Sequence, residues 1–176
     1  MEVDRLKAIV LYVLNNVPDK CLGKHELFKI LYFASQKHLI RYGDAMIADF
    51  YAFQYGPVPS ALCNYLRGDK NNNIMSAILI DDESRYILSP SEEPDMDYLS
   101  KVDVQCLDES IQENFRLNFH DLTKKSHDSA WNKAWANPTG RRGAKMDIID
   151  IAIAAGADER TIACIQENLE IEAALR

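Results

Sequence analysis

The sequence predicts a predominantly helical α+β domain, and three observations lead to this fold class. Apolar residues recur at three- and four-residue steps over 3–17 and 24–41, as on one face of an α-helix. Two shorter stretches, 49–55 and 78–88, contain the β-branched and aromatic residues typical of strands. The chain of 176 residues is 47% hydrophobic and 27% charged, which is ordinary for one globular domain. We therefore expect a compact single domain over 1–176, in which a short strand or β-hairpin packs on a helical core.

The first two helices are defined by their apolar stripes and by their stop signals. The first ends before Pro18, because proline cannot continue a helix. The second runs over 24–41, and Gly43 provides its stop. Its apolar residues span a wide arc of the helix surface. This width predicts a central helix that is contacted by neighbours on several sides.

An aromatic, β-prone segment follows the second helix. This segment, 49–55, reads as a strand that breaks at Gly56-Pro57-Val58-Pro59. Gly56 and Val58 each precede a proline, so they are expected to be extended or turning. We interpret these four residues as a rigid corner that joins the strand to a short helix. That helix is expected to run to Leu66 and to close at Gly68.

The next elements are a hairpin and two capped helices. After a polar loop at 69–73, the apolar runs 78–80 and 85–88 flank an acidic turn, which predicts a β-hairpin. Asp103 is expected to cap a helix with an apolar core face, and Ser126 is expected to cap the next helix.

The C-terminal part of the chain predicts a loop and a pair of helices. Residues 137–143 form a basic loop that is rich in turn-forming residues. Two last helices, at about 146–155 and 158–175, are expected to meet at Gly156. We regard 145–176 as a C-terminal helical hairpin extension of the domain.

Charge and composition disfavour several function classes. The chain has 20 Lys and Arg against 27 Asp and Glu, and its net charge of −7 disfavours general nucleic-acid binding, which needs positive potential. Residues 1–14 carry acids and lack the apolar core of a signal peptide. The longest apolar runs are far below the ~20 residues that cross a bilayer. The four cysteines are more than forty residues apart, so reduced thiols are expected. We predict a cytoplasmic protein with no membrane partner.

A longer pattern joins the second helix to the aromatic segment. Its parts are Leu27-Phe28-Lys29-Ile30-Leu31-Tyr32-Phe33-Ala34, His38-Leu39, Tyr42-Gly43 and Ala52-Phe53-Gln54-Tyr55-Gly56-Pro57-Val58. Their order and spacing resemble the Panacea (SocA-like antitoxin) domain. Leu122-Thr123 and Ser126-His127, followed by Trp131, are similar to a second signature of that family. The resemblance covers roughly residues 3–135.

The resemblance implies a function and a partner. Members of the family are antitoxins of bacterial or phage toxin–antitoxin systems, and they bind and neutralise a toxin that is encoded next to them. At least one member acts as an adaptor that delivers its toxin to an AAA+ protease. The resemblance thus implies a non-enzymatic protein. The motifs of the sequence add no expectation of a cofactor or a metal. The sequence leaves its oligomeric state open.

Seven residues are candidates for toxin binding. The corner would present tyrosines to a partner in a pre-ordered loop, and aromatic residues dominate interface energies. A purely structural role is the alternative for the corner. For His127 and Trp131, the alternative is that their rings pack together on one helix face. The candidates are Tyr51, Tyr55, Gly56, Pro57, Val58, His127 and Trp131.

Two other function classes stay open. Ala152, Gly156, Ile162 and Ile165 match helix-turn-helix spacing, so the alternative function is that of a DNA-binding transcriptional regulator. Five acids against two arginines over 157–176 disfavour DNA contact and suit a basic toxin surface instead.

A metal-dependent enzyme would be built on His120 and His127. No third histidine is near these two in the sequence, and no nucleophile elbow, P-loop or dinucleotide-binding motif is present. We therefore expect no enzymatic activity and no catalytic residue.

Overall fold

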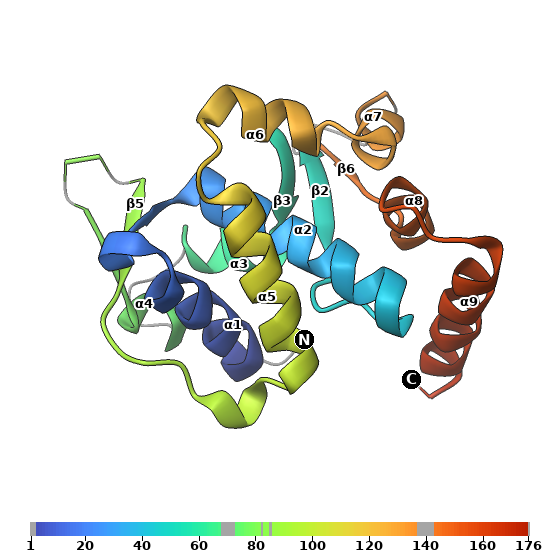
Figure 1. Ribbon diagram of the computed structural model, residues 1–176, viewed down its shortest axis with the longest axis horizontal. Helices are drawn as coiled ribbons and strands as arrows, with labels where there is room; N and C mark the ends of the chain where they lie inside the picture. Colours follow the sequence, from blue (N-terminus) through green and yellow to red (C-terminus); the bar gives the residue numbers. More distant parts are fainter. Residues whose placement is uncertain (1–2, 68–72, 82, 85, 137–142, 176) are drawn as a thin grey trace.

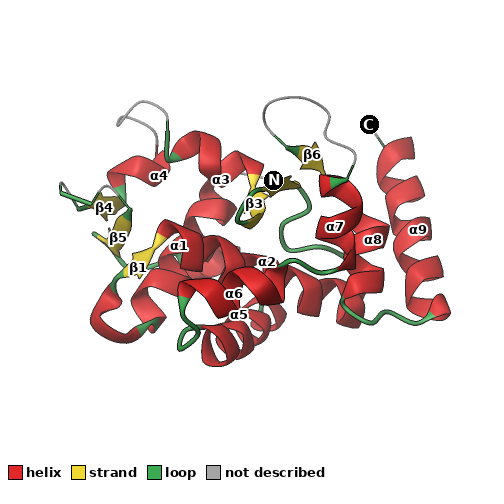
Figure 2. Cartoon of the chain, turned by 90° about the horizontal axis from the view of Figure 1, so that it is seen from above, coloured by secondary structure: helices red, strands yellow, loops and turns green. Residues whose placement is uncertain are grey.

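Helix α2 is the centre of the fold (Figure 1). The computed structural model describes residues 3–67, 73–81, 83–84, 86–136 and 143–175. In chain order its elements are α1 (Val3–Asn16), η1 (Pro18–Lys20), β1 (Leu22–Gly23), α2 (Lys24–Tyr42), β2 (Phe50–Phe53), β3 (Gly56–Pro59), α3 (Ser60–Tyr65), α4 (Asn73–Ser76), β4 (Ile78–Ile80), β5 (Ile87–Pro90), η2 (Met96–Tyr98), α5 (Lys101–Asn114), α6 (Phe119–Ser126), α7 (Ser129–Trp135), β6 (Ala144–Lys145), α8 (Ile148–Ala154) and α9 (Glu159–Ala174). The fold is predominantly helical with two small antiparallel sheets, which confirms the expected α+β class (Figure 2).

The expected central position of the second helix is confirmed. Helix α2 contacts α5, α6, α8, α9 and strands of both sheets. Its middle turns are buried on all sides, including the polar Lys29 and Gln36. Gly43 ends the helix in the left-handed conformation at φ 70°, as the stop signal predicted. The elements of both sheets and the surrounding helices therefore pack on α2.

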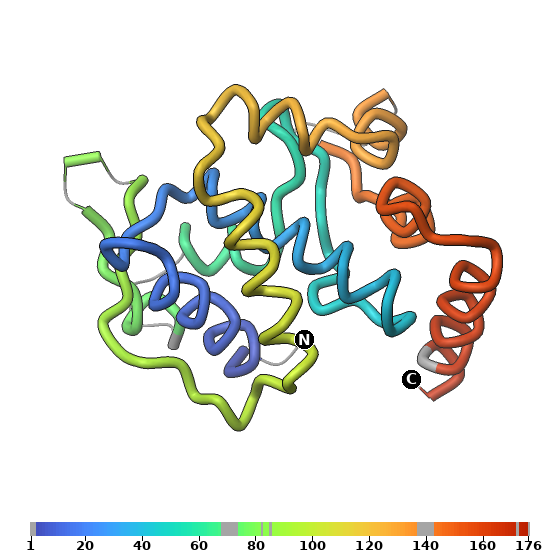
Figure 3. The backbone as a smooth tube through the Cα atoms, in the orientation of Figure 1, coloured from blue at the N-terminus to red at the C-terminus, as the bar shows by residue number. Residues whose placement is uncertain are grey.

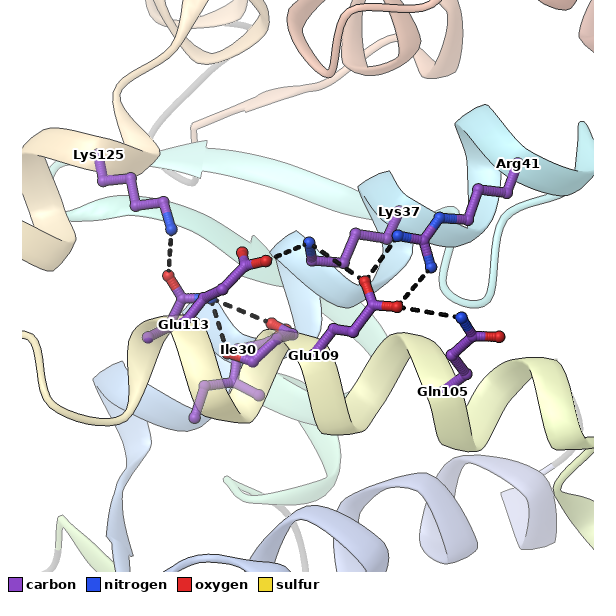
Figure 4. A network of polar contacts seen from close by, with 9 residues as sticks. Ile30, Lys37, Arg41, Gln105, Glu109, Glu113 and Lys125 are labelled. Atoms are coloured by element: carbon purple, nitrogen blue, oxygen red, sulfur yellow. Dashed lines mark hydrogen bonds and ion pairs between the residues drawn. The ribbon is translucent and has the colours of Figure 1, made fainter.

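Polar contacts fix α2 against α5 (Figure 4). The Arg41 guanidinium donates to both carboxylate oxygens of Glu109, at 2.8 and 2.6 Å. Lys37 donates to Glu113 at 2.6 Å, and the buried Ser110 hydroxyl donates to a backbone carbonyl of α2 at 2.7 Å. Hydrogen bonding to Arg41 lowers the pKa of Glu109 to about 2, so this pairing persists over the whole neutral range. These contacts hold α2 in a fixed position along α5.

One sheet has the strand order β1-β5-β4 and lies beside α1. The expected hairpin is present, with Ile80 opposite Leu88. Its second strand begins at Ile87, two residues later than expected. Strand β1 pairs Leu22 with Leu88 and is only two residues long, which is too short to give a sequence pattern.

The other sheet has the order β3-β2-β6, and it corrects the interpretation of residues 56–59. Those residues form strand β3 rather than a corner, and they pair with β2 so that Ala52 faces Pro57. Proline and the residue before it are extended, and a proline without an N–H is tolerated in an edge strand. The turn between the strands is Gln54-Tyr55, and α3 begins directly after Pro59.

Two expected helix caps are wrong by a few residues. Ser100 caps α5, and Asp103 is the third helical residue, whose carboxylate accepts the Ser100 N–H at 2.9 Å. Ser126 ends α6 instead of capping the next helix, which is capped by Asp128. Helix α6 itself is not among the helices that the sequence predicts.

The tail contains the two expected helices. Gly156 lies between α8 and α9 with φ 90°, and Asp158 caps α9. The Asn168 side chain donates to the Gly43 carbonyl at 3.0 Å, which ties α9 to the end of α2. The chain from α7 to α9 runs along one side of the molecule (Figure 3).

Some expectations fall on other parts of the chain. The stop at Gly68 and most of the loops at 69–73 and 137–143 lie outside the described residues. Within the described part of the chain, none of the helices has the length and apolarity that a bilayer span requires.

Candidate partner-binding site

An exposed group of rings lies where the β2–β3 turn meets the start of α6. The rings of Tyr55 and Phe119 meet edge to face at 5.5 Å, and they are 54% and 52% exposed. The His25 ring lies 4.2 Å from Phe119, and its Nε2 is 3.0 Å from the Thr123 hydroxyl. We call His25, Tyr55 and Phe119 the aromatic cluster. Exposed aromatic rings that are already held in place are typical of protein interfaces.

The His25 ring is neutral at physiological pH. Burial, reinforced by the positive charge of Lys29, lowers the pKa of His25 to about 4. The half-buried His25 therefore adds no charge beside the exposed rings of Tyr55 and Phe119 at pH 7.

A pocket of about 470 Å³ lies next to the aromatic cluster, and Tyr55 belongs to both. Its walls come from the start of α2, the β2–β3 hairpin, α3 and Tyr86. Most of the lining is apolar, and the charged side chains that line it are those of Lys24, Lys29 and Arg67. No acidic residue lines it within the described part of the chain. We call this space the cationic pocket.

Lys29 is the most unusual residue of the pocket. It is 1% exposed, and its ammonium donates to the Pro57 carbonyl at 2.8 Å. Burial lowers the pKa of Lys29 to about 7, and no carboxylate of the described residues counteracts this shift. A buried cation without a counter-ion is costly and rare in proteins. Lys29 is therefore charged in only a part of the molecules at neutral pH.

Gly56 allows the hairpin to approach Lys29 closely. Its φ is 100°, a conformation that L-residues rarely adopt. A Cβ atom here would lie 2.4 Å from the Ser126 hydroxyl and 2.8 Å from Cε of Lys29. Only glycine fits between these two buried side chains, so the segment around Gly56 joins α2, the hairpin and the end of α6.

A second set of rings lies at the junction of α6 and α7. His127 stacks on Trp131 at 3.6 Å with nearly parallel rings, and Trp135 continues the stack at 5.3 Å. The Trp131 indole N–H donates to the Phe53 carbonyl at 2.9 Å, and Trp131 is buried. His127 lies in the bend between the helices, so the expected shared helix face is wrong and the rings meet by stacking instead.

Asp128 connects this junction to α2. One carboxylate oxygen accepts the Tyr32 hydroxyl at 2.7 Å and the Gln36 amide at 2.9 Å. The other accepts the Trp131 backbone N–H at 2.9 Å and caps α7. Burial and the nearby carboxylate raise the pKa of Tyr32 far above its usual range, so its hydroxyl remains a donor.

Comparison with known proteins identifies the family. The family model described as "Antitoxin SocA-like, Panacea domain" matches residues 27–132, which is more than half of the chain. The chain belongs to this Panacea-domain family. No curated protein and no solved structure matches the chain. The matched range includes Tyr55, Phe119 and Lys29, and it ends before α8 and α9 of the Panacea-domain protein.

The structure distributes the seven candidate residues unevenly. Tyr55 is exposed in the aromatic cluster, and the half-buried Val58 lines the cationic pocket. Gly56, Pro57 and Trp131 are buried, so any effect they have on a partner is through the shape of the hairpin. Tyr51 and His127 are half-buried. Their role in toxin binding stays a prediction.

Sequence reasoning missed several residues of the site, and Phe119 and Lys29 are the most important of them. Phe119 was missed because α6 was not expected, although Asn118 is a good helix cap and accepts the Asp121 N–H at 3.0 Å. In the sequence, Lys29 stands out only as part of the family motif. Its burial follows from the neighbours of α2 in space, which no local pattern reveals.

The described residues contain no group of three or more His, Cys, Asp or Glu side chains that is placed to hold a metal ion. His120 is exposed on α6, and His127 faces Trp131. These two histidines therefore have different surroundings, and the metal-enzyme hypothesis gains no support from their placement.

Replacing Asp128 with asparagine is expected to lower the free energy of unfolding by about 1.5 kcal/mol. Asparagine can still cap α7, but its amide group would face the Gln36 amide and lose the charge-assisted bond to Tyr32. Urea unfolding measures the change. The matched control is Asp158→Asn, which retains a cap on α9 and should cause no measurable change. Equal effects of the two substitutions would contradict the role given to the Asp128 contacts with α2.

Proposed function

We propose that this Panacea-domain protein neutralises a protein toxin by binding it directly, and that the aromatic cluster is the centre of the binding surface. Membership in an antitoxin family supports a toxin partner. The observation that supports this surface is the pair of half-exposed rings of Tyr55 and Phe119, fixed edge to face at 5.5 Å.

The physical argument is one of preorganisation. Each ring of the cluster is already restrained by its neighbour, and His25 is further held near Thr123. A partner that covers these rings gains apolar burial while little side-chain freedom is lost. Aromatic residues at the centre of an interface contribute more binding energy than most other residues.

The remaining parts of the proposal follow from the same surface. Direct binding is the first step both of neutralisation by occlusion and of delivery to an AAA+ protease. Rescue in a host that lacks the protease is expected for occlusion and not for delivery. We also propose a cytoplasmic protein without enzymatic activity. We rank DNA binding through α8 and α9 second, because Glu159, Glu167 and Glu170 are exposed on α9 and would repel phosphates.

Serine in place of both Tyr55 and Phe119 is expected to abolish rescue of cells that express the adjacent toxin gene. The double substitution removes the exposed rings without opening the core, so affinity for the toxin should fall at least about tenfold while the fold is retained. Growth with and without induction of the toxin measures rescue, and circular dichroism checks the fold.

The control for this experiment is Tyr42→Ser. Tyr42 is 44% exposed and contacts the His38 ring, but it lies at the other end of α2. It should rescue as well as the wild type. Full rescue by the Tyr55→Ser, Phe119→Ser double variant would place the interface elsewhere. If the adjacent gene is harmless, or stays lethal in the presence of the folded wild type, the antitoxin proposal fails.

A further inference from the structure

We infer that the cationic pocket receives a segment of the toxin that carries a carboxylate between apolar side chains. This inference rests on the proposed function, since it takes the partner to be a toxin bound at the aromatic cluster. It adds the chemical character of the partner surface.

The charge of the pocket differs in sign from that of the chain. The chain has a net charge of −7, yet the charged side chains that line the pocket are cationic within the described residues. Lys24 and Arg67 both line the pocket; burial lowers the pKa of Lys24, and the positive charge of Arg67 lowers it further. Like charges that converge on a cavity without a counter-ion form a site for an anion.

Lys29 provides a donor for that anion inside the pocket. Its ammonium has three N–H donors, and the described contact to Pro57 uses one of them. A carboxylate that enters the pocket would accept from the remaining donors and would favour the charged form of the amine. The cost of burying Lys29 would then be offset in the complex.

The rest of the lining fits apolar side chains. Phe28, Phe53, Val58 and Leu66 contribute apolar walls, and the volume of about 470 Å³ lies within the roughly 300–1,000 Å³ of binding pockets. A peptide segment with one acidic and neighbouring apolar side chains matches this lining in both charge and polarity. A free inorganic anion would leave the apolar walls uncovered.

The position of the pocket favours a segment of the bound partner over a small molecule. Tyr55 forms part of the pocket wall and is also half of the exposed Tyr55–Phe119 pair. A protein that is seated on the aromatic cluster therefore extends over the pocket.

The test uses the full chain and the toxin encoded next to it, and it compares two charge-reversal variants. Lys24→Glu with Arg67→Glu reverses two cations of the pocket, and we expect the dissociation constant for the toxin to rise at least about tenfold. The matched control is Lys101→Glu with Arg160→Glu, which reverses two exposed cations that do not line the pocket and should leave the dissociation constant unchanged. Thermal unfolding checks that both variants are folded. A lysine in place of the interacting acidic residue of the toxin should restore binding to the first variant.

The outcomes separate this inference from the proposed function. No binding of the wild type to the toxin overturns both. Wild-type binding that the Lys24→Glu, Arg67→Glu variant retains in full overturns the inference and leaves the proposed function standing. An anionic small molecule that native mass spectrometry detects on the wild type and not on this variant, and that persists in the toxin complex, would overturn the assignment of the pocket to a toxin segment.

Discussion

Replacing Gly56 with alanine is expected to lower the free energy of unfolding by roughly 3–4 kcal/mol. Two costs add at this position. The backbone has φ 100°, which strains any residue with a Cβ. The new Cβ would also lie 2.4 Å from the Ser126 hydroxyl and 2.8 Å from Cε of Lys29. Both neighbours are buried, so neither can move away without disturbing the packing of α2 and α6. Urea unfolding at constant pH measures the change.

Gly156→Ala is the matched control for this prediction. Gly156 has a similar φ of 90°, but a Cβ there would meet no atom within 4 Å. This control retains the backbone strain and removes the steric term, so we expect a loss of about 1 kcal/mol. Equal losses for the two substitutions would mean that the contacts of the added Cβ with Ser126 and Lys29 have no steric cost.

The wild-type protein is expected to become more stable by about 2 kcal/mol between pH 7 and pH 9. The cause is Lys29, whose pKa burial lowers to about 7, below the 10.5 of a free lysine. In this pH range the unfolded chain binds a proton at Lys29 that the folded chain has released. Stability rises with pH wherever the unfolded state binds more protons. Denaturant midpoints across the range measure the slope.

Lys29→Met isolates the contribution of the amine. Methionine fills a similar volume without a charge, so the slope between pH 7 and pH 9 should largely disappear. The pKa of Lys24 and that of Lys125 are also lowered by burial, and both groups are unchanged in the variant and serve as the internal baseline. A variant with the same slope as the wild type would show that Lys29 is protonated in the folded state up to high pH.

The fold could be predicted where one element carries its own signal. Helices α1 and α2 have apolar stripes of many turns, and the β4–β5 hairpin has two apolar runs around an acidic turn. The two-residue strands β1 and β6 have no such signal, because they exist only through the strands beside them. The glycine and prolines of residues 56–59 predict a rigid corner, but these residues form an edge strand, where proline is tolerated.

The candidate site was predictable only in part. Tyr55 lies in a motif that the sequence displays, and it is exposed in the structure. Phe119 lies 64 positions further along the chain and meets Tyr55 only in the folded structure. The cationic pocket combines residues of four separate segments, and its cations come from two of them, since Lys24 and Lys29 lie on α2 and Arg67 follows α3. The net charge of −7 is an average over the whole chain, and it does not reveal the local positive charge of the pocket.

In the C-terminal helices, the spacing of the residues resembles a helix-turn-helix, but their burial and surface charge differ from those of a DNA-binding helix. Ala152 and Ile165 satisfy helix-turn-helix spacing because they are buried, as apolar residues of any helical pair would be. The outer surface of α9 carries exposed glutamates, and Asn168 fastens the helix to the end of α2. Packing thus accounts for Ala152 and Ile165, two of the four residues of the pattern.

Calorimetric titration of the purified protein with its toxin, in the absence of any protease, tests direct neutralisation most directly. The toxin is used as a variant whose activity has been removed by substitution. We predict saturable binding with a Kd below about 1 μM, which corresponds to about −8 kcal/mol. We also predict that the Tyr55→Ser, Phe119→Ser variant weakens this binding at least about tenfold. Absence of binding by the folded wild type at toxin concentrations of about 100 μM would contradict the account.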